Sequence, residues 1–141
     1  MNYYKELDKI LSHPYLGDTF YDVDVEYIMD TLLPSLNQDE WKKLYDGCKI
    51  KEPSYKFKLA YCLDGYDDLN AFILLMNLIF CTDEEVLEQV LISLISFDSS
   101  KYRYLLYQFP RGIDFLKKLS NHEKNKTIGR LSINVLEKFK L

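Results

Sequence analysis

The sequence predicts an all-α fold in which antiparallel helical hairpins stack into a short solenoid. Apolar residues recur at helical spacing along most of the chain. In the second half, the apolar segments are joined by links of only two to four residues, which force antiparallel neighbours. Strand signals are poor, because no Asn-Gly turn and no sustained alternation beyond residues 21–25 is present. A chain of 141 residues fits one domain, residues 1–141.

Composition and sequence patterns narrow the class of protein further. The longest uninterrupted apolar run, residues 71–76, is far shorter than the ~20 residues that span a bilayer. No basic segment followed by an apolar core opens the chain, so we expect no secretory signal. The cysteines, Cys48, Cys62 and Cys81, are odd in number and form no CxxC pattern, which indicates buried thiols in a reducing compartment. We therefore expect a cytoplasmic protein.

The first helices of the chain can be placed from their apolar spacing and their breakers. Residues 3–11 form a helix that ends before Pro14, because a residue preceding proline is pushed out of the α region. Residues 15–26 are expected to form a loop rich in aromatic and acidic side chains. Asp22 or Asp24 then caps a second helix.

Two further helices follow before the middle of the chain. The second helix is expected to run to about Leu33 and to be closed by Pro34. Asn37 or Asp39 caps a third helix, and Pro53 stands at the entry of a fourth.

A central helical hairpin is the strongest feature of the sequence. It begins after residues 64–65, and its first helix, within residues 67–80, is apolar almost all round. Thr82 is the predicted N-cap of the second helix, with Glu85 in the capping-box position. The second helix, residues 83–97, carries two adjacent apolar stripes and therefore needs neighbours on two sides.

The last third of the chain continues the helical pattern. Residues 101–108 and 111–119 form two short helices, with Pro110 in the first turn of the second. Residues 128–139 form the last helix after a polar connector. Successive helix pairs offset by about 30 residues are typical of a helical-repeat solenoid.

Charge is distributed unevenly along the chain. Residues 1–100 hold 19 acidic and 8 basic residues, a net charge of −11, whereas residues 101–141 hold 3 acidic and 10 basic ones, a net charge of +7. This split suggests a partner of defined polarity, although a dipolar protein can also be merely soluble. The acidic majority would repel a long nucleic acid, so we expect no nucleic-acid partner. Because no apolar run is long enough to span a bilayer, we also expect no membrane partner.

Catalytic and cofactor motifs are absent from the sequence. The two histidines, His13 and His122, lie near opposite ends of the chain, and no cluster has metal-ligand spacing. The glycines are isolated, so no phosphate-binding loop is present. We expect no enzymatic activity, no cofactor and no metal.

Acidic and aromatic side chains gather in two places and make the best candidates for a binding surface. One place is the loop of residues 15–26, and the other is the outer edge of the central hairpin. The candidate partner-binding residues are Tyr15, Asp18, Tyr21, Asp22, Asp24, Asp64, Tyr66, Asp67, Asp68 and Asp98. A purely structural alternative is that the acids at the edge stabilise helix N-termini.

The second helix of the central hairpin resembles a known repeat. Residues 83–94, with the sequence DEEVLEQVLISL, are similar to the second helix of a HEAT-type repeat. The shared features are the acidic start, Val86, and the leucines Leu91 and Leu94. Leu87 departs from the pattern, because HEAT repeats often place an arginine there.

The chain as a whole resembles the immunity proteins of bacterial toxin systems, including contact-dependent growth inhibition. The features that carry this resemblance are the chain length, residues 64–68, residues 83–97 and the acidic bias. The resemblance implies tight binding to a cognate toxin, typically a basic nuclease, whose active site the acidic surface covers. Two alternatives stay open: a helical adaptor that binds a peptide or protein, and an enzyme of unrecognised chemistry.

Overall fold

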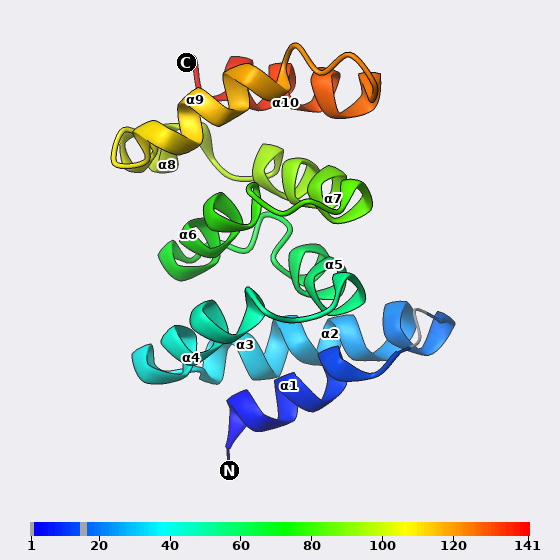
Figure 1. Ribbon diagram of the computed structural model, residues 1–141. Helices are drawn as coiled ribbons and strands as arrows, with labels where there is room; N and C mark the ends of the chain where they lie inside the picture. Colours follow the sequence, from blue (N-terminus) through cyan, green and yellow to red (C-terminus); the bar gives the residue numbers. More distant parts are fainter. Residues whose placement is uncertain (1, 15–16) are drawn as a thin grey trace. The chain divides into compact units, whose positions relative to one another are not determined.

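The computed structural model describes residues 2–14 and 17–141, and this part of the chain is helical, without strands (Figure 1). The prediction of an all-α protein is therefore confirmed. The chain forms two compact units, Met1–Cys62 and Leu63–Leu141. The single domain expected from the chain length stays a prediction. No helix in the described ranges is both long enough and apolar enough to cross a membrane.

Three regular helices of the first unit lie where the sequence places them. They are α1 (Tyr3–Ser12), α4 (Gln38–Cys48) and α5 (Pro53–Cys62), and α1 packs against both of the others. Asn37 caps α4 through a capping box, in which Glu40 returns a hydrogen bond to the Asn37 backbone. The core of the unit is aliphatic around α1, where Leu7 and Leu11 are fully buried.

The second predicted helix is longer than the sequence suggested. It continues through η1 (Phe20–Asp24), α2 (Val25–Tyr27), η2 (Ile28–Leu32) and α3 (Leu33–Ser35), where η1 and η2 are π-helical turns. The loop expected over residues 15–26 is therefore wrong from Asp18 onward, although Tyr15 lies outside the described residues.

The expected helix boundaries in this stretch are also wrong. Asp22 and Asp24 lie inside the helical stretch and cap nothing, because the first turn already closes on the Gly17 carbonyl. Pro34 does not end the helix. Proline disrupts a helix because it cannot form the regular i→i−4 hydrogen bond. Directly before Pro34, the Leu33 N–H already bonds to the Ile28 carbonyl, five residues back, so the helix has left the regular pattern at this point.

The π-helical turns give this helix a repeat of four residues. A turn closed by i→i+5 bonds holds more residues than the 3.6 of an α-helix, so residues four apart lie closer to a straight line. Phe20, Ile28 and Leu32 are all buried on one such line. The opposite face is offset by two residues and is exposed, as described below.

The second unit contains five helices within residues 63–141. They are α6 (Leu69–Leu78), α7 (Glu84–Ile95), α8 (Ser99–Leu106), α9 (Pro110–Leu119) and α10 (Lys126–Lys138). α7 packs against both α6 and α10, which satisfies its two apolar stripes, and α9 packs against α8 and α10 (Figure 1). Thr82 is not the N-cap of α7. Asp83 takes this role because the helix starts one residue later, and its carboxylate accepts the Val86 N–H at 3.0 Å.

An aromatic cluster centred on Phe72 forms the core of this unit. The ring of Phe72 lies 5.2 Å from Phe97, 4.9 Å from Tyr102 and 5.9 Å from Phe139, measured between centroids. All four side chains are buried, and aromatic pairs in such geometry add about 1 kcal/mol each beyond the area that they bury. The cluster thus ties α6 to α8 and to the end of α10.

Gly65 turns the chain before α6 with a φ of +62°. A Cβ at this position would lie 3.0 Å from the Ser96 Cβ and 3.2 Å from the Ser96 carbonyl oxygen. Both the backbone angle and the available space therefore require glycine here.

We predict that Gly65→Ala lowers the free energy of unfolding by about 2 kcal/mol, because alanine is strained at positive φ and meets Ser96. Urea titration measures the change. The matched control is Gly17→Ala, since no atom lies within 4 Å of a Cβ there. An equal effect of the two substitutions would contradict this account of Gly65.

The thiols of Cys48 and Cys62 are buried, whereas Cys81 is partly exposed. Burial raises the pKa of Cys48 to about 11 and that of Cys62 to about 12. In the unfolded chain these thiols lose their protons near pH 9, so above that pH the folded state holds more protons than the unfolded state.

We therefore predict that the free energy of unfolding falls as the pH rises from 8 to 10, by about 1 kcal/mol per buried thiol. Urea titrations at several pH values measure this slope. The double variant Cys48→Ser, Cys62→Ser should have a shallower slope over the same range, whatever its absolute stability. A slope identical to that of the natural chain would refute the assignment to these thiols.

Candidate protein-binding surfaces

Four carboxylates lie along the exposed face of the helix that runs through residues 18–35. This acidic stripe consists of Asp18, Asp22, Glu26 and Asp30, each four residues from the next and each exposed. Because the helix repeats nearly every four residues here, the four side chains project in one direction. The stripe thus places four negative charges side by side on the surface of the first unit.

The repulsion between the stripe carboxylates costs stability, and no ion pair within the described ranges offsets this cost. Like charges at i and i+4 on a helix repel by about 0.2–0.5 kcal/mol per pair. No ion pair involves a stripe carboxylate in the described part of the chain. Elsewhere in the same unit, Lys42 and Asp46 form an i,i+4 ion pair at 2.8 Å. The uncompensated stripe is therefore a candidate surface for a cationic partner.

Asp24, also predicted to bind a partner, faces the interior instead. It lines a cavity of about 410 Å³ together with Lys58, whose side chain is 1 % exposed. Burial lowers the pKa of Lys58 and Asp24 opposes this shift, while the ammonium donates a hydrogen bond to the His13 carbonyl. Asp24 therefore serves the internal electrostatics of the unit.

Tyr21 is half exposed beside the stripe. Its ring makes edge-to-face contacts with Phe20 at 5.4 Å and with Tyr61 at 5.1 Å, measured between centroids. This packing holds the ring in place while 41 % of the residue stays accessible. A rigid, partly exposed tyrosine next to carboxylates is a suitable anchor for a protein partner.

The second candidate surface, the acidic edge of the second unit, consists of Asp64, Asp67, Asp68 and Asp98. Asp67 accepts hydrogen bonds from Lys101 Nζ at 2.8 Å and from the Tyr102 hydroxyl at 2.7 Å. The hydrogen bond from Lys101, followed by that from Tyr102, lowers the pKa of Asp67. Burial and then this same hydrogen bond raise the pKa of Tyr102. The charge of Asp67 is thus partly neutralised within the chain.

Two other carboxylates of the acidic edge cap helices. Asp68 accepts the Asn70 N–H at 2.7 Å at the start of α6, and Asp98 accepts both the N–H and the hydroxyl of Ser100 at the start of α8. The hydrogen bonds from Ser100 lower the pKa of Asp98. The structural alternative, in which these acids stabilise helix N-termini, therefore holds for both residues.

The acidic edge still presents a shaped surface. A shallow pocket of about 360 Å³ is lined by Asp67, Asp68, Leu69, Lys101, Tyr102 and Leu105. Leu69 is 54 % exposed at this pocket. Asp64 is exposed, and Tyr66 is half-buried with a pKa raised by burial and by Asp68. The structure thus brings part of the predicted edge together, but with less free charge than the sequence suggested.

Glu26 and Asp30 belong to the stripe but are not among the predicted partner-binding residues. The spacing of the acids in the sequence could have indicated them. The acidic positions 18, 22, 26 and 30 and the buried positions 20, 28 and 32 share a period of four. On a helix of 3.6 residues per turn, each of these acids is rotated by about 40° from the one before, so the row curves away from a straight line. In the described residues, no group of three or more His, Cys, Asp or Glu side chains could hold a metal ion.

We predict that Glu26→Lys raises the free energy of unfolding by about 1 kcal/mol. The substitution replaces two like-charge i,i+4 contacts, with Asp22 and Asp30, by two attractive ones. Thermal or urea unfolding at low salt measures the gain, and Glu26→Gln should give about half of it. The gain should shrink in 0.5 M salt, because exposed charges are screened. A loss of stability in both variants would show that Glu26 has a structural partner.

Comparison of the chain with protein-family models, with curated proteins and with solved structures gives no match.

Proposed function

We propose that this chain is a cytoplasmic, non-enzymatic protein-binding inhibitor of the immunity type, which neutralises a cognate basic toxin, most simply a nuclease. The observation that carries the proposal is the acidic stripe of four exposed carboxylates without an internal ion pair. A nuclease must bind phosphates, so its active site is lined by cations. A row of carboxylates can occupy the same cations and block access of the nucleic acid.

Electrostatic capture suits an inhibitor of this kind. Opposite charges on two surfaces raise the association rate by one or more orders of magnitude at low salt. Tyr21, held against Phe20 and Tyr61, supplies an anchor beside the charges, and such aromatic residues carry a large share of interface energy. The stripe would steer the toxin, and the aromatic anchor would slow its release.

The proposal extends to the architecture. We propose that the helices of the second unit are arranged as HEAT-like hairpins, with α6 and α7 forming one repeat. The mutual packing of α6 and α7 and the contact of α7 with α10 support this arrangement. The acidic edge at the start of α6 and α8 would then add a second contact for the same partner.

A helical adaptor that binds a peptide is the second candidate. It is favoured by a pocket between α6 and the start of α9, which lies entirely within the second unit. The two candidates make different demands on the chain, because an inhibitor of a basic toxin depends on the stripe and an adaptor depends on the pocket.

The test begins with purification of the tagged chain from its native host at low salt, identification of what is retained, and an assay of the retained protein for nuclease activity. We predict that the triple variant Asp22→Lys, Glu26→Lys, Asp30→Lys binds the retained toxin at least 30-fold more weakly and no longer inhibits it. The difference in affinity should shrink at 0.5 M salt.

The matched control is Asp114→Lys, Glu123→Lys, Glu137→Lys, which changes the net charge equally at exposed positions of the second unit. This variant should bind and inhibit nearly as well as the natural chain. Equal weakening in both variants would assign the effect to net charge alone. Undiminished binding by the stripe variant, or a retained partner without toxin activity, would refute the proposal.

A further inference from the structure

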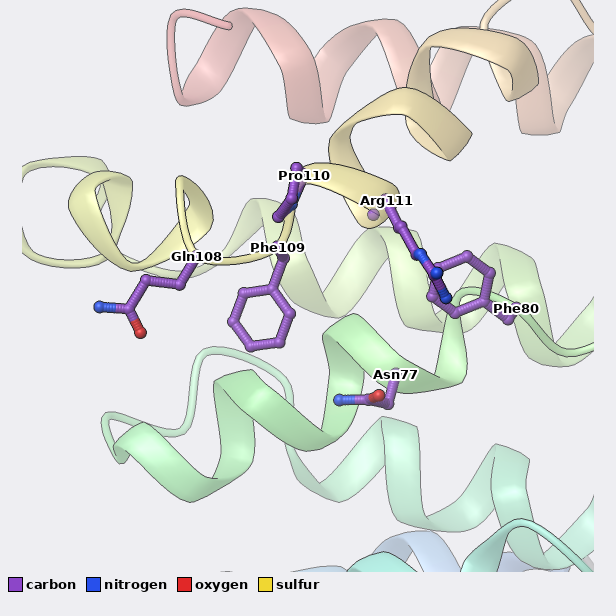
Figure 2. Close-up of a pocket in the computed structure, with 7 residues that line it drawn as sticks. Asn77, Phe80, Gln108, Phe109, Pro110 and Arg111 are labelled. Carbon is purple, nitrogen blue, oxygen red and sulfur yellow. The ribbon is translucent and has the colours of Figure 1, made fainter.

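A pocket of about 480 Å³ lies within the second unit and belongs to neither acidic surface (Figure 2). It is lined by Asn77, Phe80, Gln108, Phe109, Pro110, Arg111 and Gly112. These residues come from the end of α6, from the link between α8 and α9, and from the first turn of α9. The volume falls in the range of ~300–1,000 Å³ that is typical of small-ligand sites.

Close packing of α9 on α6 shapes the floor of this pocket. A Cβ at Gly112 would lie only 2.8 Å from the Met76 Cε and 3.6 Å from the Ile79 Cδ1, so the start of α9 lies directly against α6 here. The ring of Phe80 lies 5.0 Å from that of Phe115, measured between centroids, and Phe80 remains 48 % exposed. Contacts on both sides of the pocket thus fix its apolar wall.

Arg111 is the single charged residue among those that line the pocket. Its side chain is exposed and forms no ion pair with any carboxylate in residues 2–14 and 17–141. In Figure 2, it extends from the start of α9 in the direction of Phe80. A guanidinium can hold a carboxylate through two parallel hydrogen bonds, so the pocket is suited to an anionic group.

Two carboxamides complete the lining. Asn77 donates from its amide nitrogen to the Ile73 carbonyl at 2.8 Å, which fixes the side chain and leaves its oxygen free to accept. Gln108 is exposed in the link that follows α8, and in Figure 2 its side chain extends away from Asn77 and Arg111. A carboxamide offers both a donor and an acceptor, which are the two groups that a peptide bond requires.

We propose that this pocket binds the C-terminal residue of a partner polypeptide. The terminal carboxylate pairs with Arg111, an apolar last side chain packs against Phe80 and Phe109, and the last peptide group bonds to the Asn77 carboxamide. The lining favours an occupant that joins a carboxylate to an apolar side chain, and the last residue of a polypeptide carries both groups. The site is independent of the acidic stripe and needs no toxin.

The experiment uses the full-length, isotope-labelled chain and two probes that differ in one group. One probe is acetyl-Gly-Gly-Phe with a free carboxylate, and the other is the same peptide with a terminal carboxamide. Titration followed by nuclear magnetic resonance reports both the affinity and the position of binding. We expect the acid to bind at least tenfold more tightly than the amide, with shifts at Phe80, Phe109 and Arg111.

Two variants test whether Arg111 causes the preference for the acid over the amide. Arg111→Gln should weaken binding of the acid at least tenfold and remove the preference over the amide. Arg130→Gln makes the same charge change at an exposed position of α10 that does not line the pocket, and it should leave binding unchanged.

Three results would overturn the proposal: equal affinity for acid and amide, no binding of either at millimolar concentration, or an equal loss in the two variants. A fourth would reassign the ligand. If free N-acetylphenylalanine binds as tightly as the tripeptide, the pocket recognises a small carboxylic acid and the chain end of a partner contributes nothing further.

Discussion

The π-helical turns between Phe20 and Leu32 are the constraint on which the first unit depends. They bring the buried side chains at positions 20, 28 and 32 onto one line, so that this line can face the core along its whole length. The same change of period aligns positions 18, 22, 26 and 30 on the opposite face. On a regular α-helix of 3.6 residues per turn, each set would drift by roughly 120° from its first to its last residue. The alignment of the core side chains and the alignment of the charged ones therefore arise from one feature of the backbone.

Three carboxylate environments bear on the choice between the stripe and the acidic edge. Asp68, Asp83 and Asp98 cap helices, where the backbone N–H groups offset the cost of their charge. Asp67 is paired with Lys101 and Tyr102. The residues of the stripe have neither kind of partner in the described part of the chain. Charge that remains uncompensated at a cost in stability is the kind that a protein retains for an external partner, which is why the stripe, and not the more crowded edge, carries the proposed function.

How far the sequence predicts this structure depends on whether local signals and tertiary packing agree. The helices around Leu7, Trp41, Phe72 and Val90 follow ordinary apolar spacing and N-caps, and these elements were predicted with boundaries within a few residues. The helix from Phe20 onward was not, because Gly17 and Asp18 are typical of a loop and Pro34 is typical of a helix end. Buried side chains at a spacing of four override these local preferences by forming π-helical turns. A search of the sequence for the 3.6-residue period of an α-helix therefore does not find where this helix begins.

The candidate binding surfaces, too, could be predicted from the sequence only in part. The composition of the acidic edge could be read directly from the sequence, but the roles of its members could not, because a capping aspartate and a free aspartate have the same sequence neighbours. The contact between Asp67 and Lys101, 34 residues apart, and the caps formed by Asp68 and Asp98 show that part of this charge is used within the chain. The pocket near Arg111 was also invisible in the sequence, since it joins residues around position 77 to residues around position 110. Residues 59–100 contain no lysine or arginine, so the cations available to carboxylates of the second unit come from α8 onward. Lys101, at the start of that basic segment, pairs with Asp67, whereas Arg111, ten residues later, forms no ion pair within residues 2–14 and 17–141, which is why the proposed ligand of the pocket is an anion.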